Sequence, residues 1–144
     1  MKEVDLSDFP GMLGKLDQKE QVINELVETI EKLAEYIRKG FRMKPGDSET
    51  FEFESYNSLS ARVDFKTLKN GDYIFMLDYV HAYGAVPRTS EITREEIRNF
   101  SLSNPFMWRF VLDLPKLVAS VRGRLQSEIN EMEEIKTVVK QCPL

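Results

Sequence analysis

The chain has a single histidine, His81, within the stretch that has its clearest strand pattern. A two-residue hairpin turn at Asn70-Gly71 would place three polar or aromatic side chains on the same sheet face as His81: Arg62, Tyr73 and Tyr79. A histidine beside an arginine can act as a general base or bind a small anion. A lone strand histidine is more often packed or hydrogen-bonded, and we favour that interpretation.

The same register places Asp78 on the opposite face, among apolar residues. A carboxylate on a core face needs a partner, and carboxylates in such places concentrate at functional sites. A β-bulge near the end of the strand would instead turn Asp78 outward. We favour the bulge and keep a functional Asp78 as the alternative.

Composition excludes several kinds of active site. With one histidine and one cysteine, Cys142, the chain cannot build a histidine zinc cluster, an intramolecular disulfide or a multi-cysteine metal site. It has no Walker A, nucleophile-elbow, zinc-protease or dinucleotide-binding pattern. We therefore predict no metal and no cofactor, and an enzyme that uses His81 or Asp78 is the third of three functional hypotheses.

Charge disfavours nucleic acid as a partner, because the net charge is −4. The aromatic residues beside Arg62 resemble a stacking platform for single strands, but acidic residues share their predicted face. The densest basic cluster comprises Arg38, Lys39, Arg42 and Lys44. Its favoured role is to complement the dipole at a helix end, and contact with a small anion or phosphate is the alternative.

No segment has the roughly 18 consecutive apolar residues of a membrane span. The N-terminal residues lack the basic and then apolar order of a signal peptide. These features predict a cytoplasmic protein with no membrane partner.

The hairpin belongs to a predicted three-stranded antiparallel meander over 49–83. Residues 49–55 alternate strictly between apolar and acidic or polar side chains, which is typical of a half-buried strand. The strand from Tyr73 to Ala82 has large apolar groups on both faces, so we expect it to be central or to meet a partner. If Asn70-Gly71 is the loop, Lys69 lies opposite Asp72 and fixes the register.

Helices are predicted on both sides of the meander. Apolar residues at seven-residue spacing, with others between them, predict a long amphipathic helix over 16–39, ended by Gly40. A capping box at Thr93 and Glu96 predicts a short helix over 94–100, and a second short helix is predicted at 105–112. A long helix is predicted over 114–141, with Pro115 as a kink or as the start of a new helix capped by Asp113. The fold class is α+β in a single domain, 1–144, with the two long helices paired antiparallel on one sheet face.

The order of helix, β-meander and helix resembles the layout of a prefoldin-type chaperone subunit. The segment 84–104 and Pro115 depart from the uninterrupted returning coil of that layout.

The apolar surface left over predicts a partner, and a second copy of the chain is the default. Our leading hypothesis is a non-enzymatic, homo-oligomeric interaction or assembly protein that binds itself or another protein. Its predicted interface combines an aromatic sheet face with the helices: Phe75, Leu77, Phe106, Trp108 and Phe110. The second hypothesis is a regulatory protein that binds a small ligand or single-stranded nucleic acid through Arg62, Tyr79 and His81, with Tyr73 and Asp78 nearby.

Overall fold

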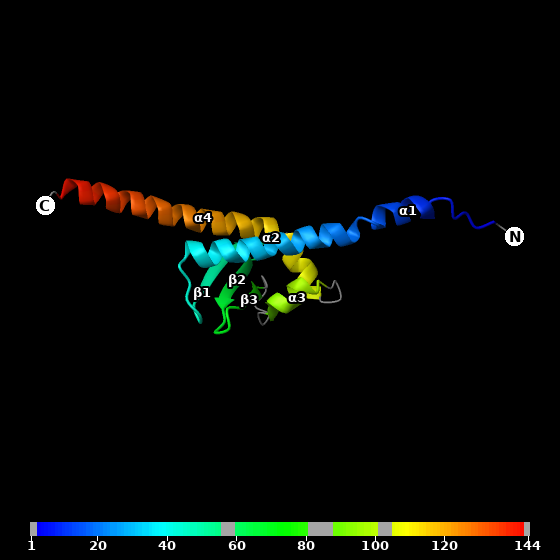
Figure 1. Cartoon of the computed structure of the whole chain (residues 1–144), viewed down its shortest axis with the longest axis horizontal. Coiled ribbons are helices and arrows are strands. Elements are labelled where there is room, and N and C mark those ends of the chain that lie inside the picture. The colour runs from blue at the N-terminus through cyan, green and yellow to red at the C-terminus, as the bar shows by residue number, and fades with distance from the viewer. Residues whose placement is uncertain (1–2, 56–59, 81–87, 101–104, 143–144) are drawn as a thin grey trace.

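The computed structural model describes residues 3–55, 60–80, 88–100 and 105–142, and it has an α+β fold (Figure 1). Two long helices lie on one face of a four-stranded antiparallel sheet of order β1-β2-β3-β4. The elements follow in chain order: α1 (Phe9–Leu16), α2 (Lys19–Gly40), β1 (Ser48–Glu54), β2 (Ser60–Thr67), β3 (Tyr73–Val80), β4 (Arg88–Thr93), α3 (Arg94–Arg98) and α4 (Pro105–Gln141).

The β2–β3 loop has three residues rather than the predicted two. The amide of Gly71 donates to the carbonyl of Leu68 at 3.1 Å, and the amide of Leu68 donates to the carbonyl of Asp72 at 2.7 Å. Within this loop only Gly71 has a positive φ, +86°, whereas a type I′ turn would require a positive φ at both central residues. This is a type I turn followed by a bulge glycine, and it shifts the register by one residue.

The shift exchanges the two faces of β3 relative to β2. Phe65 now lies opposite Phe75, with ring centroids 5.2 Å apart, and Val63 lies opposite Leu77. Asp78 lies opposite Arg62 on the other face. It leaves the core face, as we favoured, but the cause is the one-residue register shift and not a β-bulge near the strand end, because pairing with β2 is regular along the whole of β3. Because side chains alternate along a strand, one extra residue in the loop is enough to move every side chain of β3 to the opposite face relative to β2.

The aromatic face of the sheet is therefore the covered one. It packs beneath α2 and α4, and these side chains are buried there: Phe51, Ala61, Val63, Phe65, Tyr73, Phe75, Leu77, Tyr79 and Ile92. β3 is central, between β2 and β4, as its apolar character predicted.

The fourth strand, β4, was not predicted. Only Ile92 in it is a large apolar residue, and that side chain is fully buried. The next residue, Thr93, caps α3 by accepting a hydrogen bond from the amide of Glu96 at 3.1 Å, so the predicted cap at this position is confirmed.

Gly40 does not end α2 in the way that the sequence suggested. The left-handed residue is Arg42, with φ +50°, and the amide of Met43 bonds back to the carbonyl of Arg38 at 3.0 Å, which completes a Schellman motif. Gly40 instead permits a close approach, because a Cβ there would clash with the side chain of Leu125 in α4.

The predicted helices at 105–112 and 114–141 form one helix, α4, with Pro115 inside it. Side chains of α4 also cover the edge strand β1. Lys116, Ser120 and Arg124, each four residues apart, donate to main-chain carbonyls of Ser55, Glu52 and Thr50 at 3.2, 3.1 and 2.7 Å. This row occupies carbonyl groups that an uncovered edge would offer to another strand.

The long helices α2 and α4 run in the same direction, not antiparallel (Figure 1). An apolar stripe looks the same for either direction of its partner, so the sequence pattern could not decide this. The two helices are staggered, and α4 extends beyond the body at one end while α1 and the first turns of α2 extend at the other. The returning coil of the prefoldin-like layout is therefore not formed.

Candidate functional site

The structure does not bring the predicted ligand-binding residues together. Arg62 is exposed on the open sheet face, opposite Asp78, whereas Tyr79 is buried on the covered face. Tyr73 is also on the covered face, at the other end of β3. His81 lies outside the described residues. The corrected register is the reason, because it moves every side chain of β3 to the other face relative to β2.

Tyr79 belongs to a buried polar network that the sequence did not reveal. Its hydroxyl donates to Asp113 at 3.3 Å, and the hydroxyl of Ser55 donates to both oxygens of the same carboxylate at 2.8 and 2.9 Å. The guanidinium of Arg109 lies 3.5 Å from the centroid of the Tyr79 ring. Of the two alternatives for Pro115, the new helix capped by Asp113 is wrong, because α4 passes through Asp113 and its side chain is buried.

The predicted interface residues separate into two groups. Phe75, Leu77 and Phe110 are buried within the chain and offer no surface to a partner. Phe106 is half-buried, and Trp108 is 49% exposed. The aromatic sheet face thus cannot be the working surface, because α2 and α4 cover it.

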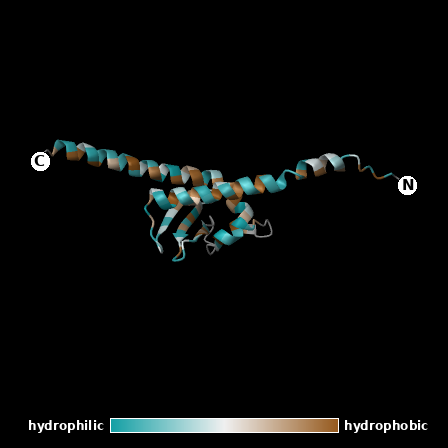
Figure 2. Ribbon diagram, viewed as in Figure 1, coloured by the Kyte–Doolittle hydropathy of each residue, from teal (hydrophilic) through white to brown (hydrophobic). Residues whose placement is uncertain are grey.

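The exposed apolar surface lies instead on the two projecting arms. The C-terminal arm, residues 126–141 of α4, carries an apolar stripe along its length (Figure 2). Its exposed apolar side chains are Ile129, Met132, Ile135, Val138 and Val139. At Val139 the exposed fraction reaches 65%.

The N-terminal arm, residues 9–25, comprises α1 and the first turns of α2. Its exposed apolar side chains are Phe9, Met12, Leu13, Leu16 and Val22. Phe9 and Leu16 continue the seven-residue spacing of Ile23, Ile30 and Ile37, of which only Ile30 and Ile37 are buried. The arm therefore extends the stripe that packs in the body.

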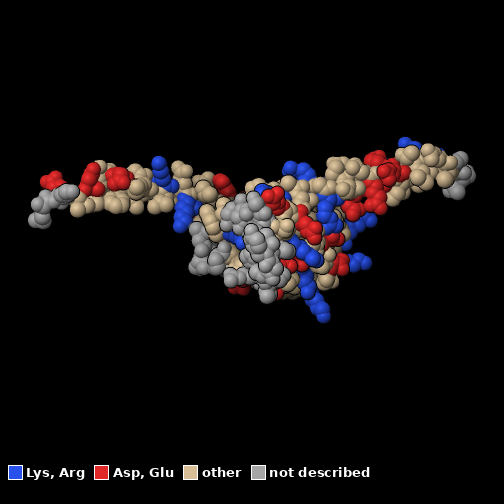
Figure 3. Space-filling view, turned by 180° about the vertical axis from the view of Figure 1, so that it is seen from behind, with Lys and Arg blue, Asp and Glu red and all other residues tan. Residues whose placement is uncertain are grey.

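Within the described residues, no helix has the length and apolar character needed to cross a membrane. Acidic side chains gather along both arms (Figure 3). These arms are amphipathic helices whose apolar sides are left exposed by the part of the chain that the structure describes.

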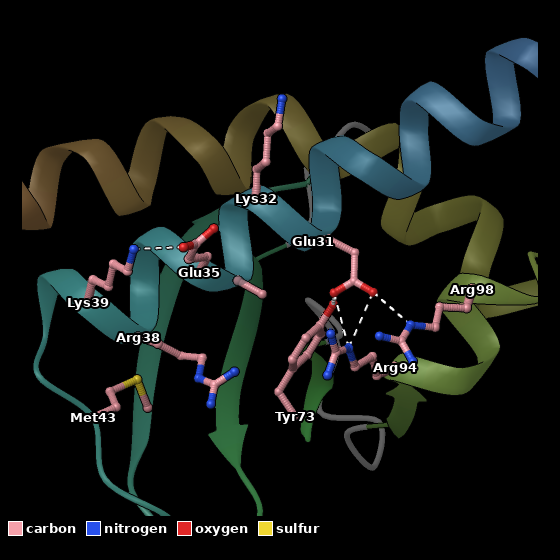
Figure 4. Close-up of a pocket in the computed structure, with 10 residues that line it drawn as sticks. Glu31, Lys32, Glu35, Arg38, Lys39, Met43, Tyr73, Arg94 and Arg98 are labelled. Atoms are coloured by element: carbon pink, nitrogen blue, oxygen red, sulfur yellow. Dashed lines mark hydrogen bonds and ion pairs between the residues drawn. The ribbon is translucent and has the colours of Figure 1, made fainter. Parts of the chain in front are cut away.

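A second feature is a polar cluster around Glu31, on the exposed side of α2 (Figure 4). The Glu31 carboxylate accepts hydrogen bonds from the Tyr73 hydroxyl at 2.6 Å, from Arg94 Nε at 3.2 Å and from Arg98 Nε at 3.0 Å. Arg94 also pairs with Asp72 at 3.1 Å and lies over the Tyr73 ring. The cluster ties α2 to β3 and α3.

These contacts shift the pKa of each partner. Burial raises the pKa of Glu31, but the hydrogen bonds from Tyr73, Arg98 and Arg94 outweigh it and hold the pKa below its usual value. Burial, together with the hydrogen bond to Glu31, raises the pKa of Tyr73. Glu31 is therefore ionised and Tyr73 neutral near pH 7.

Comparison with protein-family models, with curated proteins and with solved structures finds no match to this chain.

Proposed function

We propose that this protein is a non-enzymatic assembly protein that associates with copies of itself in a head-to-tail manner. In this proposal the N-terminal arm of one copy packs against the C-terminal arm of the next. The protein acts in the cytoplasm, where a lone cysteine such as Cys142 stays reduced.

The observation that carries the proposal is the stagger of the two parallel helices. Each arm is the continuation of a stripe that packs inside the body, and the two arms point away from each other (Figure 1). They cannot meet within one chain, so the partner helix has to come from another chain, and the proposal assigns it to a second copy. At 1.5 Å per residue each arm is about 24 Å long, so the two uncovered stripes match in length.

The start of the C-terminal arm has a hollow that could bind the tip of an N-terminal arm from another copy. Where α2 ends, a hollow of about 590 Å³ opens against α4, lined partly by Phe41, Leu125, Ile129 and Met132. An arriving N-terminal arm that runs parallel to α4 would continue the line of α2. Its Phe9, which is 50% exposed, would then enter this apolar hollow.

Charges along the arms suit the same alignment. With Phe9 at the hollow, Lys15 falls within a helical turn of Glu131 and Glu134, and Glu20 falls near Lys136. Pairing two C-terminal arms instead would bring together two sets of four glutamates, Glu128, Glu131, Glu133 and Glu134. The apolar stripes therefore favour the head-to-tail contact, and Lys15 and Lys136 supply pairs of opposite charge within it.

Sedimentation velocity over the micromolar range tests self-association. We expect the sedimentation coefficient of the wild-type chain to rise with concentration, and a Met132→Asp/Val139→Asp variant to remain monomeric because it places charges on the stripe. An Asn130→Asp/Thr137→Asp variant is the matched control, since it adds the same charge on another side of the arm. A wild-type chain that stays monomeric at high micromolar concentration contradicts the proposal.

A further inference from the structure

A hollow of about 690 Å³ lies beside the Glu31 cluster, between α2, the segment after it and α3. Its volume is in the range of small-molecule sites. Tyr73, Ala34 and Met43 form its less polar wall, and charged side chains surround the rest (Figure 4). Apolar and charged side chains therefore line the same space, with Met43 beside Arg38 and Tyr73 beside Arg94 (Figure 4).

The hollow is positive although the protein is acidic. Five cationic side chains line it, against the two carboxylates Glu31 and Glu35: Lys32, Arg38, Lys39, Arg94 and Arg98. The chain as a whole has a net charge of −4. A local excess of positive charge in a concave site attracts anions even when the total charge does not.

The cations differ in how fully their charge is already paired. Lys39 pairs with Glu35 at 2.7 Å. Arg94 and Arg98 share Glu31, and each retains N–H groups that these contacts do not use. Arg38 is half-buried and makes no ion pair with any described residue, and its guanidinium points into the hollow (Figure 4).

A half-buried guanidinium that has no carboxylate within ion-pair distance, and only the longer-range charge of Glu35 nearby, gains most from an anionic ligand. Arg38 approaches the hollow from α2, while Arg94 and Arg98 approach it from α3 (Figure 4). Guanidinium groups bind phosphate oxygens through paired N–H donors. Glu31 holds Arg94 and Arg98 in place, so these donors need little reorganisation when an anion arrives.

We propose that this hollow binds a small ligand carrying a phosphate group, with the phosphate between Arg38 and the two arginines of α3. The organic part of the ligand lies against Met43 and Ala34. The site is independent of the arms and does not rest on the proposed self-association.

Isothermal titration of the full chain at constant ionic strength tests this site, with inorganic phosphate and phenyl phosphate as the probes. We expect both to bind, phenyl phosphate more tightly, and Arg38→Gln to weaken binding of each by at least about tenfold through loss of charged hydrogen bonds. Arg38→Lys keeps the charge and loses the paired donors. For each probe, its affinity should therefore lie between that of the wild type and that of Arg38→Gln.

Arg62→Gln is the matched control, because it removes the same charge from the open sheet face and should bind both probes like the wild type. Circular dichroism of each variant confirms that the fold is kept. Binding no stronger than that of chloride at equal ionic strength, or unchanged binding in Arg38→Gln, overturns the proposal.

Discussion

At the scale of single residues, Glu31 is the side chain that joins most parts of the fold. It receives donors from β3 and α3 while it belongs to α2. Nothing in the amino-acid sequence distinguishes it from the other glutamates of α2, because its partners come from residues 42, 63 and 67 positions further along the chain. The sequence predicted Tyr73 as a ligand-binding residue beside Arg62 and Tyr79, whereas in the structure it contacts Glu31 and Arg94.

We predict that Glu31→Gln lowers the free energy of unfolding at pH 7 by about 1–2 kcal/mol, because charged hydrogen bonds are lost. The pKa of Glu31 is lowered in the folded state, so its contribution is present above its ordinary value of 4.5 and is lost as the pH falls through the folded value. Urea unfolding at pH 7 and pH 3.5 measures both effects.

Glu35→Gln is the control for this substitution. Glu35 pairs with the exposed Lys39 one turn away and feels the charge of Arg38 at longer range, so we expect a change within about 0.5 kcal/mol. Equal effects of the two substitutions would show that the Glu31 cluster does not stabilise the fold.

The raised pKa of Tyr73 leads to a prediction about folding stability at alkaline pH. Its pKa is raised above the ordinary value of 10.0, so the unfolded chain loses the phenolic proton first and folding stability declines as the pH rises above that value. In Tyr73→Phe this part of the decline should be absent. Urea unfolding at pH 8 and pH 10.5 checks it, and an identical decline in the variant would contradict the assignment.

At the scale of elements, the sequence predicted the type of most elements correctly and their relations less well. The strand pattern of β1, β2 and β3 and the cap at Thr93 were readable because they depend on local alternation and local hydrogen bonds. The hairpin register was not, because Asn70-Gly71 fits two loop lengths that differ by one residue. This single ambiguity displaced Asp78, Phe75 and Leu77 from their predicted faces.

The remaining differences also have local causes. β4 has a single large apolar residue, Ile92, so its pattern is too weak to stand out. Pro115 lies within a helix whose other residues continue the apolar spacing, and packing of Leu114 and Leu117 on the core keeps the helix continuous.

The contact of α4 with β1 gives a prediction at this scale. Arg124 donates to the carbonyl of Thr50, pairs with Glu49 at 2.8 Å and lies over the rings of Phe41 and Phe51. We expect Arg124→Gln to lower the free energy of unfolding by about 1–3 kcal/mol.

Arg122→Gln serves as the comparison, since Arg122 is exposed two residues away and should change the stability by less than about 0.5 kcal/mol. Chemical denaturation of the two variants distinguishes them. A loss at Arg122 as large as that at Arg124 would rule out a specific role for the α4–β1 contacts.

At the scale of the whole molecule, the parallel stagger of α2 and α4 produces two uncovered arms. An isolated helix of this length is marginally stable in water, so the arms gain from a partner. The leftover apolar surface on α4 was expected from the sequence, whereas the N-terminal arm followed only from the observed direction of the helices. Head-to-tail contacts build open chains unless their geometry closes a ring.

The most direct test of the head-to-tail contact mixes two variants that are each damaged in one arm. Phe9→Asp/Leu16→Asp disables the N-terminal arm, and Met132→Asp/Val139→Asp disables the C-terminal arm; all four side chains are exposed, so the body should fold normally. Sedimentation velocity is measured on each variant and on an equimolar mixture. We expect each variant alone to be monomeric and the mixture to form a one-to-one dimer. Self-association of the N-terminal variant by itself, or a mixture that stays monomeric, would rule out the head-to-tail contact.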